Sequence, residues 1–299
     1  MQLQRVCEKF YAHYSSALNL SGHTLRAYAG DLKHAKNFIG ETTEFSSIKK
    51  ECLRGYIRSM RVEEKLKEST IKRRISCLKL LFKWAYQESI IKSNPFDSLN
   101  ERIRLPKRLP RAIDSEDASK LRRISTTLND STDFDTHCTK TAICLLLETG
   151  IRVGELSSIQ IDDISLPDKC IKIHGKGNRQ RLVYFFSPEV ISIVSSFIAK
   201  RKHLNQQIPT LLISKIGKKI SPSNVRQALS DLVRSMHIER HITPHMLRHT
   251  CATQWLSKGL DIRHVQKLLG HQSISTTEIY THVSDQSLRD ALQRANGGW

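Results

Sequence analysis

Six side chains in the second half of the chain could act together on a phosphodiester. They are two imidazoles, two guanidiniums, one amine and one phenol, at Arg152, Lys176, His245, Arg248, His271 and Tyr280. A phenol attacks phosphorus only if fixed cations take up the charge that grows on the phosphorus oxygens, and arginine offers a planar fork for that purpose. Such a set is able to break and rejoin a nucleic-acid backbone with neither a metal nor a nucleotide cofactor.

The spacing of these residues supports a shared site. His245 and Arg248 are three apart, so on a helix they project to one side and can reach one anion. A core histidine beside a surface arginine is the alternative, because His-x-x-Arg is a short pattern. Arg152 stands between two glycines, which permit close backbone approach to a phosphate, and Glu155 could orient its fork through an ion pair. The alternative there is an ordinary helix pair.

Neither the histidines nor the cysteines predict a metal site. His245 and His249 are four apart, yet the residues between them lack the glutamate of a metalloprotease helix, and Arg248 would repel a cation. The seven cysteines are an odd set without a Cys-x-x-Cys pair, which argues against a disulfide framework and against a zinc ribbon. We therefore expect no metal and no cofactor.

The overall charge favours a polyanionic partner. The 299 residues suffice for about two domains, and 48 Lys and Arg against 29 Asp and Glu give a formal net charge of +19. Each neutralised phosphate releases condensed counterions, which favours DNA, although RNA or an anionic membrane would fit the charge alone. The sequence has no run of about 18 apolar residues and no signal-peptide core near its start, which predicts a cytoplasmic, nucleoid-associated protein without a membrane span.

Apolar residues spaced by three and four predict an all-helical bundle over residues 1–100, with helices beginning near residues 3, 24, 48 and 69. Residues 101–111 contain two prolines and many basic side chains, so we expect an extended linker. Residues 112–299 then form a second domain with a tail helix. This tail could dock into a neighbouring subunit or fold back on its own domain.

Basic side chains of the fourth helical stretch and of the linker are the predicted DNA contacts. In the helix they fall largely away from the apolar stripe, as in a helix laid in or across a DNA groove. A solvated basic face is the alternative. The residues are Lys72, Arg73, Lys79 and Lys83 in the helix and Arg104, Lys107, Arg108 and Arg111 in the linker.

The second domain is predicted to be mostly helical with one small β-hairpin. The turn of the hairpin carries Lys176, and Gly150 ends a helix just before Arg152. Capping-box spacing over residues 275–278 places Tyr280 in the first turns of a small terminal helix. The predicted helices span 114–128 and 139–149, begin at Pro188, Ser221 and Thr243, and run from Asp261 to Gly270; the strands span 170–174 and 181–185.

The order of the six residues resembles that of the tyrosine recombinase, or phage integrase, family, and within it the Xer-like recombinases and integrases. The most specific stretch is Leu268-Leu-Gly-His-Gln-Ser-Ile-Ser-Thr-Thr-Glu-Ile-Tyr-Thr-His282. Residues 24–31 and 69–78 are similar to the core-binding domain of Xer-like members. The resemblance implies a mainly α fold, with a helical, SAM-like core-binding domain before an α+β catalytic domain that carries the small hairpin.

The resemblance also implies a role for each residue. Tyr280 would attack phosphorus to form a 3′-phosphotyrosyl link, and Lys176 would protonate the departing 5′ oxygen. His271 would hydrogen-bond a nonbridging oxygen, and His245 could take the proton of the phenol. The implied partners are double-stranded DNA with inverted half-sites and a homotetramer, or a related recombinase, in the synaptic complex.

Two other functions fit part of the pattern. A type IB topoisomerase shares the chemistry, although the two-domain length and the Leu-Gly-His-x-Ser segment look more like a recombinase. A non-catalytic DNA-binding protein on the same fold is the other alternative, and the presence of competent side chains at all six positions argues against it.

Overall fold

The structure, a computed structural model, describes residues 1–16, 22–99, 112–129, 132–175, 180–204 and 208–270. Contacts between Cα atoms divide the chain into two compact units, Met1–Lys107 and Arg108–Trp299. Among the described residues, no helix has both the length and the apolar character that a membrane crossing requires.

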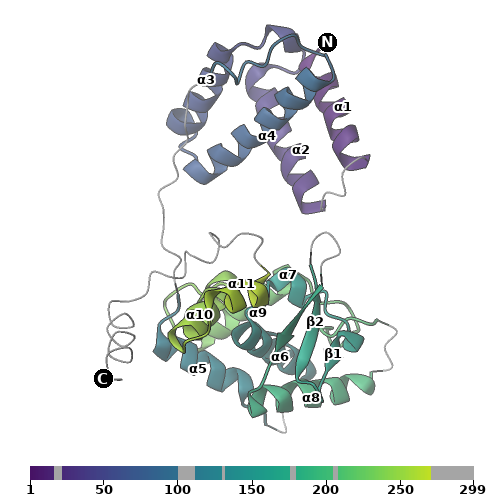
Figure 1. The fold of residues 1–299 in the computed structure, drawn as a ribbon, viewed down its shortest axis with the longest axis vertical. Helices are drawn as coiled ribbons and strands as arrows, with labels where there is room; N and C mark the ends of the chain where they lie inside the picture. Colours follow the sequence, from purple (N-terminus) through teal and green to yellow (C-terminus); the bar gives the residue numbers. More distant parts are fainter. Residues whose placement is uncertain (17–21, 100–111, 130–131, 176–179, 205–207, 271–299) are drawn as a thin grey trace, which may run out of the picture. The chain divides into compact units, whose positions relative to one another are not determined.

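The described part of the first unit is a bundle of α-helices (Figure 1). The helix predicted to begin near Thr24 starts two residues earlier, at Gly22, and the predicted helical bundle is confirmed. Short turns lie at Phe45–Ser47 (3-10) and Ser59–Glu63 (π). The α-helices are α1 (Leu3–Ser16), α2 (Gly22–Ile39), α3 (Lys50–Arg58) and α4 (Glu68–Gln87).

Aromatic rings fill the core of this bundle. Phe10, Phe45, Tyr56 and Phe82 are almost completely buried. Phe45 stacks on Phe82 with ring centroids 4.5 Å apart, which fixes the segment before α3 against α4. The apolar stripe of α4 therefore faces inward, and its other side remains available to solvent.

Helix α6 (Phe134–Thr149) lies at the centre of the second unit, and longer helices pack around it (Figure 1). The prediction placed its start at residue 139, which was wrong. Asp133 caps the helix by accepting a hydrogen bond from the Thr136 backbone N–H at 3.0 Å, so one more turn forms. The surrounding helices are α5 (Ser115–Thr126), α8 (Pro188–Lys202), α9 (Pro222–Ser235) and α10 (Pro244–Ser257).

A small antiparallel sheet in the order β1-β2-β3 covers part of this core. The predicted hairpin is present as β2 (Cys170–His174) and β3 (Gln180–Tyr184), with Ile173 opposite Arg181. The strand β1 (Ile164–Ser165) was not predicted, because two residues carry no readable alternation and depend on pairing with β2. A 3-10 turn, Ile161–Asp163, leads into it.

Two short helices complete the described part of the second unit, α7 (Val153–Leu156) and α11 (Ile262–Leu269). Asp261 caps the start of α11, as its sequence indicated. Gly150 and Gly270 end α6 and α11 with φ values of 60° and 65°, in the left-handed region that glycine adopts without steric cost. The predicted ends of both helices are confirmed.

All seven cysteines are free thiols, six of them buried and Cys52 partly exposed. Burial raises the pKa of Cys7, Cys77, Cys138 and Cys144 to about 12. These thiols therefore stay protonated and pack as small apolar groups.

Candidate active site

The carboxyl end of α11 is a meeting point for three arginines that are distant in sequence. The last carbonyls of a helix have no partner within it. Here the Leu268 carbonyl accepts a hydrogen bond from Arg181 Nε at 2.7 Å. The Leu269 carbonyl accepts from Arg248 Nη2 at 2.7 Å and from Arg152 Nη1 at 3.4 Å. Two of the six predicted site residues thus share one acceptor.

Arg152 directly precedes α7, and its backbone and side chain both reach Glu155. The backbone N–H donates to Glu155 Oε2 at 2.8 Å, and Nη1 donates to Oε1 at 2.9 Å. The predicted ion pair is therefore present. The side chain of Arg152 remains 41 % exposed, and within the described part of the chain Nη2 makes only a long hydrogen bond, to the Gly270 carbonyl at 3.4 Å, which leaves it available to a ligand.

Glu155 also receives a second arginine, Arg181 of β3. Nη1 and Nη2 of Arg181 donate to Oε1 and Oε2 at 3.0 and 2.7 Å, and both side chains are about nine-tenths buried. Burial alone would raise the pKa of Glu155, but hydrogen bonds from Arg181 and Arg152 and their charges outweigh it and lower that pKa. The carboxylate is therefore ionised at neutral pH, with two guanidiniums sharing its charge.

Arg248 is a buried residue rather than a surface one. Its side chain is almost fully enclosed, and Nη1 donates to the Gly150 carbonyl at 2.7 Å. The bonds to Gly150 and Leu269 connect α10 with the end of α6 and the end of α11. A buried guanidinium held in this way is an oriented positive charge in a surrounding of low polarity.

His245 lies in the first turn of α10, one turn before Arg248. Its pKa is lowered by partial desolvation and then by the positive charges of Arg248, Arg226 and Arg152. The same three charges show that His245, the two predicted arginines and α9 share one neighbourhood. At neutral pH the imidazole is uncharged and able to accept a proton.

Several predicted residues lie outside the described part of the chain. Lys176 belongs to the segment between β2 and β3, and His271 directly follows Gly270 in sequence. The others are Tyr280 and the linker residues Arg104, Lys107, Arg108 and Arg111. Their roles remain predictions.

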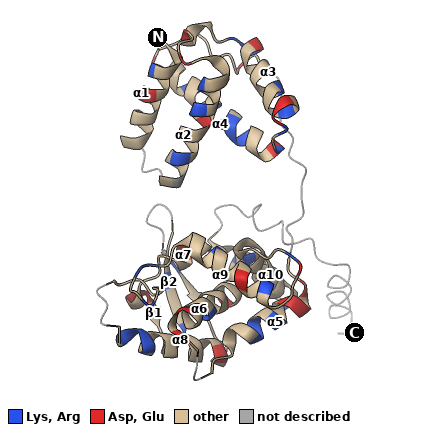
Figure 2. Ribbon diagram, turned by 180° about the vertical axis from the view of Figure 1, so that it is seen from behind, with Lys and Arg blue, Asp and Glu red and all other residues tan. Residues whose placement is uncertain are grey.

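The predicted basic residues of α4 are exposed, and Figure 2 shows Lys and Arg positions along this helix. Lys72, Lys79 and Lys83 lie on the side away from the buried stripe. Arg73 is also exposed but forms an ion pair with Asp31 of α2, whose side chain is almost fully buried. One of the four cations is therefore already paired within the protein.

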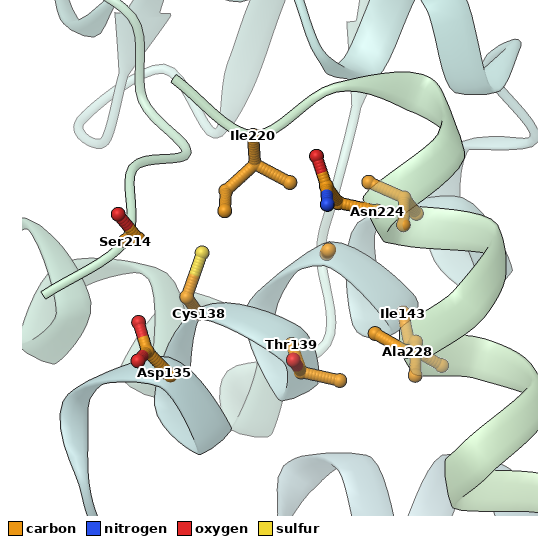
Figure 3. Close-up of a pocket in the computed structure, with 10 residues that line it drawn as sticks. Asp135, Cys138, Thr139, Ile143, Ser214, Ile220, Asn224 and Ala228 are labelled. Atoms are coloured by element: carbon orange, nitrogen blue, oxygen red, sulfur yellow. The ribbon is translucent and has the colours of Figure 1, made fainter. Parts of the chain in front are cut away.

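A separate cavity of about 150 Å³ lies between α6, α9 and the segment before α9 (Figure 3). Cys138, Ile220 and Val225 line it, together with the carboxylate of Asp135. Its lining is mainly apolar and, among the described residues, includes no cationic side chain, so it is a poor site for a phosphate. Of the predicted catalytic residues that the structure describes, Arg152, His245 and Arg248, none lines it.

Two further residues of this site, Arg181 and Arg226, were missed by the sequence reasoning. Arg181 alternates with Val183 and Phe185, both buried, so it stands on the inward side of β3. An arginine on the buried face of a strand needs a partner, and that signal could have identified it. Arg226 follows Val225 on an amphipathic helix, and nothing in its local sequence distinguishes it from a solvated arginine.

The family follows from profile matches over both units. The phage integrase family matches residues 113–287, and the phage integrase N-terminal SAM-like domain matches residues 7–89. The chain is therefore a recombinase that acts on DNA, and it belongs to the phage integrase family of tyrosine recombinases.

Xer proteins are among its relatives. Tyrosine recombinase XerC of Thermodesulfovibrio yellowstonii is 32% identical over 293 residues, which cover 96% of this chain and 94% of the relative. Tyrosine recombinase XerC of Listeria innocua is 31% identical over 292 residues, with 96% of each chain covered. The chain is thus Xer-like over nearly its whole length.

Solved structures share the fold. The XerH site-specific recombinase bound to a palindromic difH substrate has a TM-score of 0.77 at 22% identity, covering 97% of this chain and 83% of that one. The Tn1549 transposon integrase in complex with circular intermediate DNA has a TM-score of 0.77 at 21% identity, covering 98% and 99%. Both likenesses support the same mainly helical architecture with a small sheet.

Proposed function

We propose that this tyrosine recombinase exchanges DNA strands between two specific sites through a 3′-phosphotyrosyl intermediate on Tyr280. Arg152 and Arg248 bind the nonbridging oxygens of the scissile phosphate, and His271 donates to the same group. His245 accepts the proton of the phenol, and Lys176 protonates the 5′ oxygen that leaves. The bond energy is conserved in the phosphotyrosyl ester, so rejoining needs no nucleotide.

The observation that carries this proposal is the shared carbonyl of Leu269. It holds Arg152 and Arg248 at one point, and His271 is two residues further along the chain. Two cations fixed before substrate arrives require little reorganisation when charge develops on phosphorus. The neutral imidazole of His245 in the same neighbourhood supplies the proton acceptor.

The partner in this proposal is double-stranded DNA with two inverted half-sites, bound by a homotetramer or together with a related recombinase. Residues 1–100 form the core-binding domain, residues 101–111 the linker, and residues 112–299 the catalytic domain. Lys72, Arg73, Lys79 and Lys83 of α4 contact the DNA, and the linker adds Arg104, Lys107, Arg108 and Arg111.

The test is Tyr280→Phe. The DNA site is first enriched by the wild-type protein from a random-sequence duplex pool and then prepared as a nicked duplex that traps the covalent intermediate. We expect the wild type to form a protein–DNA adduct on denaturing gels, and the variant to bind the same duplex without forming one, because the ring lacks its nucleophilic oxygen. Adducts formed by the variant would refute the role of Tyr280, and relaxation of plasmids that lack the site would indicate a topoisomerase.

A further inference from the structure

Arg181 makes three side-chain hydrogen bonds near the candidate active site, and the proposed function does not use it. Its side chain is 12% exposed. Its Nε donates to the last turn of α11, and its two terminal nitrogens hold both oxygens of Glu155. One guanidinium therefore joins β3, α7 and α11, the three elements whose flanking segments carry Lys176, Arg152 and His271.

The contact between Arg181 and Glu155 limits how many hydrogen bonds the Glu155 carboxylate can accept from Arg152. With Arg181 in place, Arg152 makes a single side-chain bond to Glu155, and its remaining bonds to carbonyls are long, at 3.4 Å. An isolated carboxylate prefers a bidentate pair with a guanidinium. If Arg181 were absent, the buried carboxylate would be free to take both terminal nitrogens of Arg152, and the fork would turn away from a phosphate.

We propose that Arg181 is a positioning residue of this active site, which occupies Glu155 so that the guanidinium of Arg152 stays directed at the scissile phosphate. This inference rests on the proposed function, because it concerns the geometry of that same site. Arg181 acts only through Glu155, Arg152 and the end of α11.

The experiment compares Arg181→Met and Arg181→Lys with the wild type on the nicked duplex described above, under single-turnover conditions with saturating protein. Since misplacement of a catalytic group by about 1 Å can cost about 100-fold in rate, we expect adduct formation to fall about 100-fold for Arg181→Met. Arg181→Lys keeps the charge without the fork and should lie between this variant and the wild type. Binding of the duplex should change by less than about threefold, because phosphate contacts elsewhere dominate affinity.

Arg122→Met is the matched control. Arg122 pairs with Glu148 at 2.6 Å in the same unit, so this variant also breaks an arginine–glutamate ion pair. Its adduct rate should remain near that of the wild type. A loss equal to that of Arg181→Met would mean that the site responds to the removal of any ion pair in this unit, which would overturn the inference.

A second substrate separates positioning from a general structural role. A methylphosphonate at the scissile position replaces one charged nonbridging oxygen with a methyl group, so Arg152 has less charge to stabilise. We expect the defects of Arg181→Met, Arg181→Lys and Arg152→Ala all to shrink on this substrate. A merely structural defect would be the same on both substrates, and that result would refute the inference.

A double variant tests the route through Glu155. In Arg181→Met/Glu155→Gln, the neutral amide no longer attracts Arg152, so the rate should be no lower than that of Arg181→Met. If the loss of adduct rate in the double variant equalled the product of the losses in the two single variants, the inference would be contradicted. If Arg181→Met melts below the assay temperature, Arg181→Lys carries the same comparisons. A wild type that forms no adduct would instead refute the proposed function, so the two failures are distinguishable.

Discussion

At the level of single residues, the candidate active site depends on positive charges that are brought together by shared acceptors. Arg152 and Arg248 share the carbonyl of Leu269, and Arg152 and Arg181 share the carboxylate of Glu155. Each acceptor reduces the repulsion between neighbouring guanidiniums. The same charges act on His245, whose pKa they lower together with desolvation.

The depressed pKa of His245 predicts how cleavage depends on pH. If His245 accepts the phenolic proton, the adduct rate should rise with pH through an apparent pKa below the ordinary value for histidine. In Arg226→Gln one destabilising positive charge is removed, so the protonated imidazole becomes easier to form and its pKa rises. We therefore expect the acidic limb of the pH–rate profile to move to higher pH, measured as single-turnover adduct formation.

Arg234→Gln is the control for this shift. Arg234 lies on the same helix, α9, but is 75% exposed and pairs with Asp231 at 3.5 Å. Its acidic limb should coincide with that of the wild type. An unchanged limb in Arg226→Gln would show that His245 is not the group whose titration limits cleavage.

The sequence was sufficient to predict side-chain contacts within short motifs. It was insufficient to predict contacts between side chains of different helices and strands. The pairing of Arg152 with Glu155 could be predicted because the two are three residues apart. The burial of Arg248 could not, because its acceptors, Gly150 and Leu269, come from other helices. Arg73 was predicted to bind DNA, but its pairing with Asp31 of α2 depends on how two helices pack.

At the level of elements, the way in which α6 ends determines the position of Arg152. Gly150 has a φ of 60°, and a Cβ built there would lie 3.2 Å from both Cys251 Sγ and Leu269 Cδ2. The left-handed conformation lets the chain leave the helix and turn into α7 within three residues. The Gly150 carbonyl then becomes free to accept from Arg248.

Gly150→Ala should therefore destabilise the protein. A non-glycine residue in the left-handed region costs about 1–2 kcal/mol, and the close contacts with Cys251 and Leu269 add to it. The loss should appear as a lower midpoint in urea with little change in slope. Gly154→Ala is the control, because a Cβ there meets nothing within 4 Å, and its stability should be equal to or above that of the wild type. Equal stability of Gly150→Ala and wild type would contradict this account.

Helix ends were predictable where a side chain caps its own helix. Thr243 and Asp261 accept hydrogen bonds from backbone N–H groups within their first turns, and both starts were identified from sequence. The start of α6 was placed five residues late, although Asp133 carried the same kind of signal. The strand β1 had no local signal, since two residues become a strand only by pairing with β2.

At the level of the whole molecule, the net charge of +19 favours DNA binding. The exposed lysines of α4 should contribute part of the binding affinity. Lys72→Ala/Lys83→Ala should weaken binding of the enriched duplex at low salt. It should also flatten the plot of log K against log salt by about 0.9 for each phosphate that the protein no longer neutralises. The measurement is a salt titration of affinity by fluorescence anisotropy.

Lys120→Ala is the control for the salt titration. Lys120 is an exposed lysine of α5 whose charge is already paired with Glu116 at 2.6 Å. Its salt slope should match that of the wild type. If the two α4 lysines leave the slope unchanged as well, the basic side of α4 is a solvated surface and some other part of the chain contacts the phosphates.

The distribution of thiols has a practical consequence for spectroscopy. Six of the seven cysteines are buried, and Cys52 of α3 is the one with partial exposure. Because a maleimide dye reacts with an accessible thiol faster than with an enclosed one, we expect the folded native chain to be labelled first at Cys52. A fluorophore on α3 would report the arrival of a duplex at the first unit without any engineered cysteine replacement.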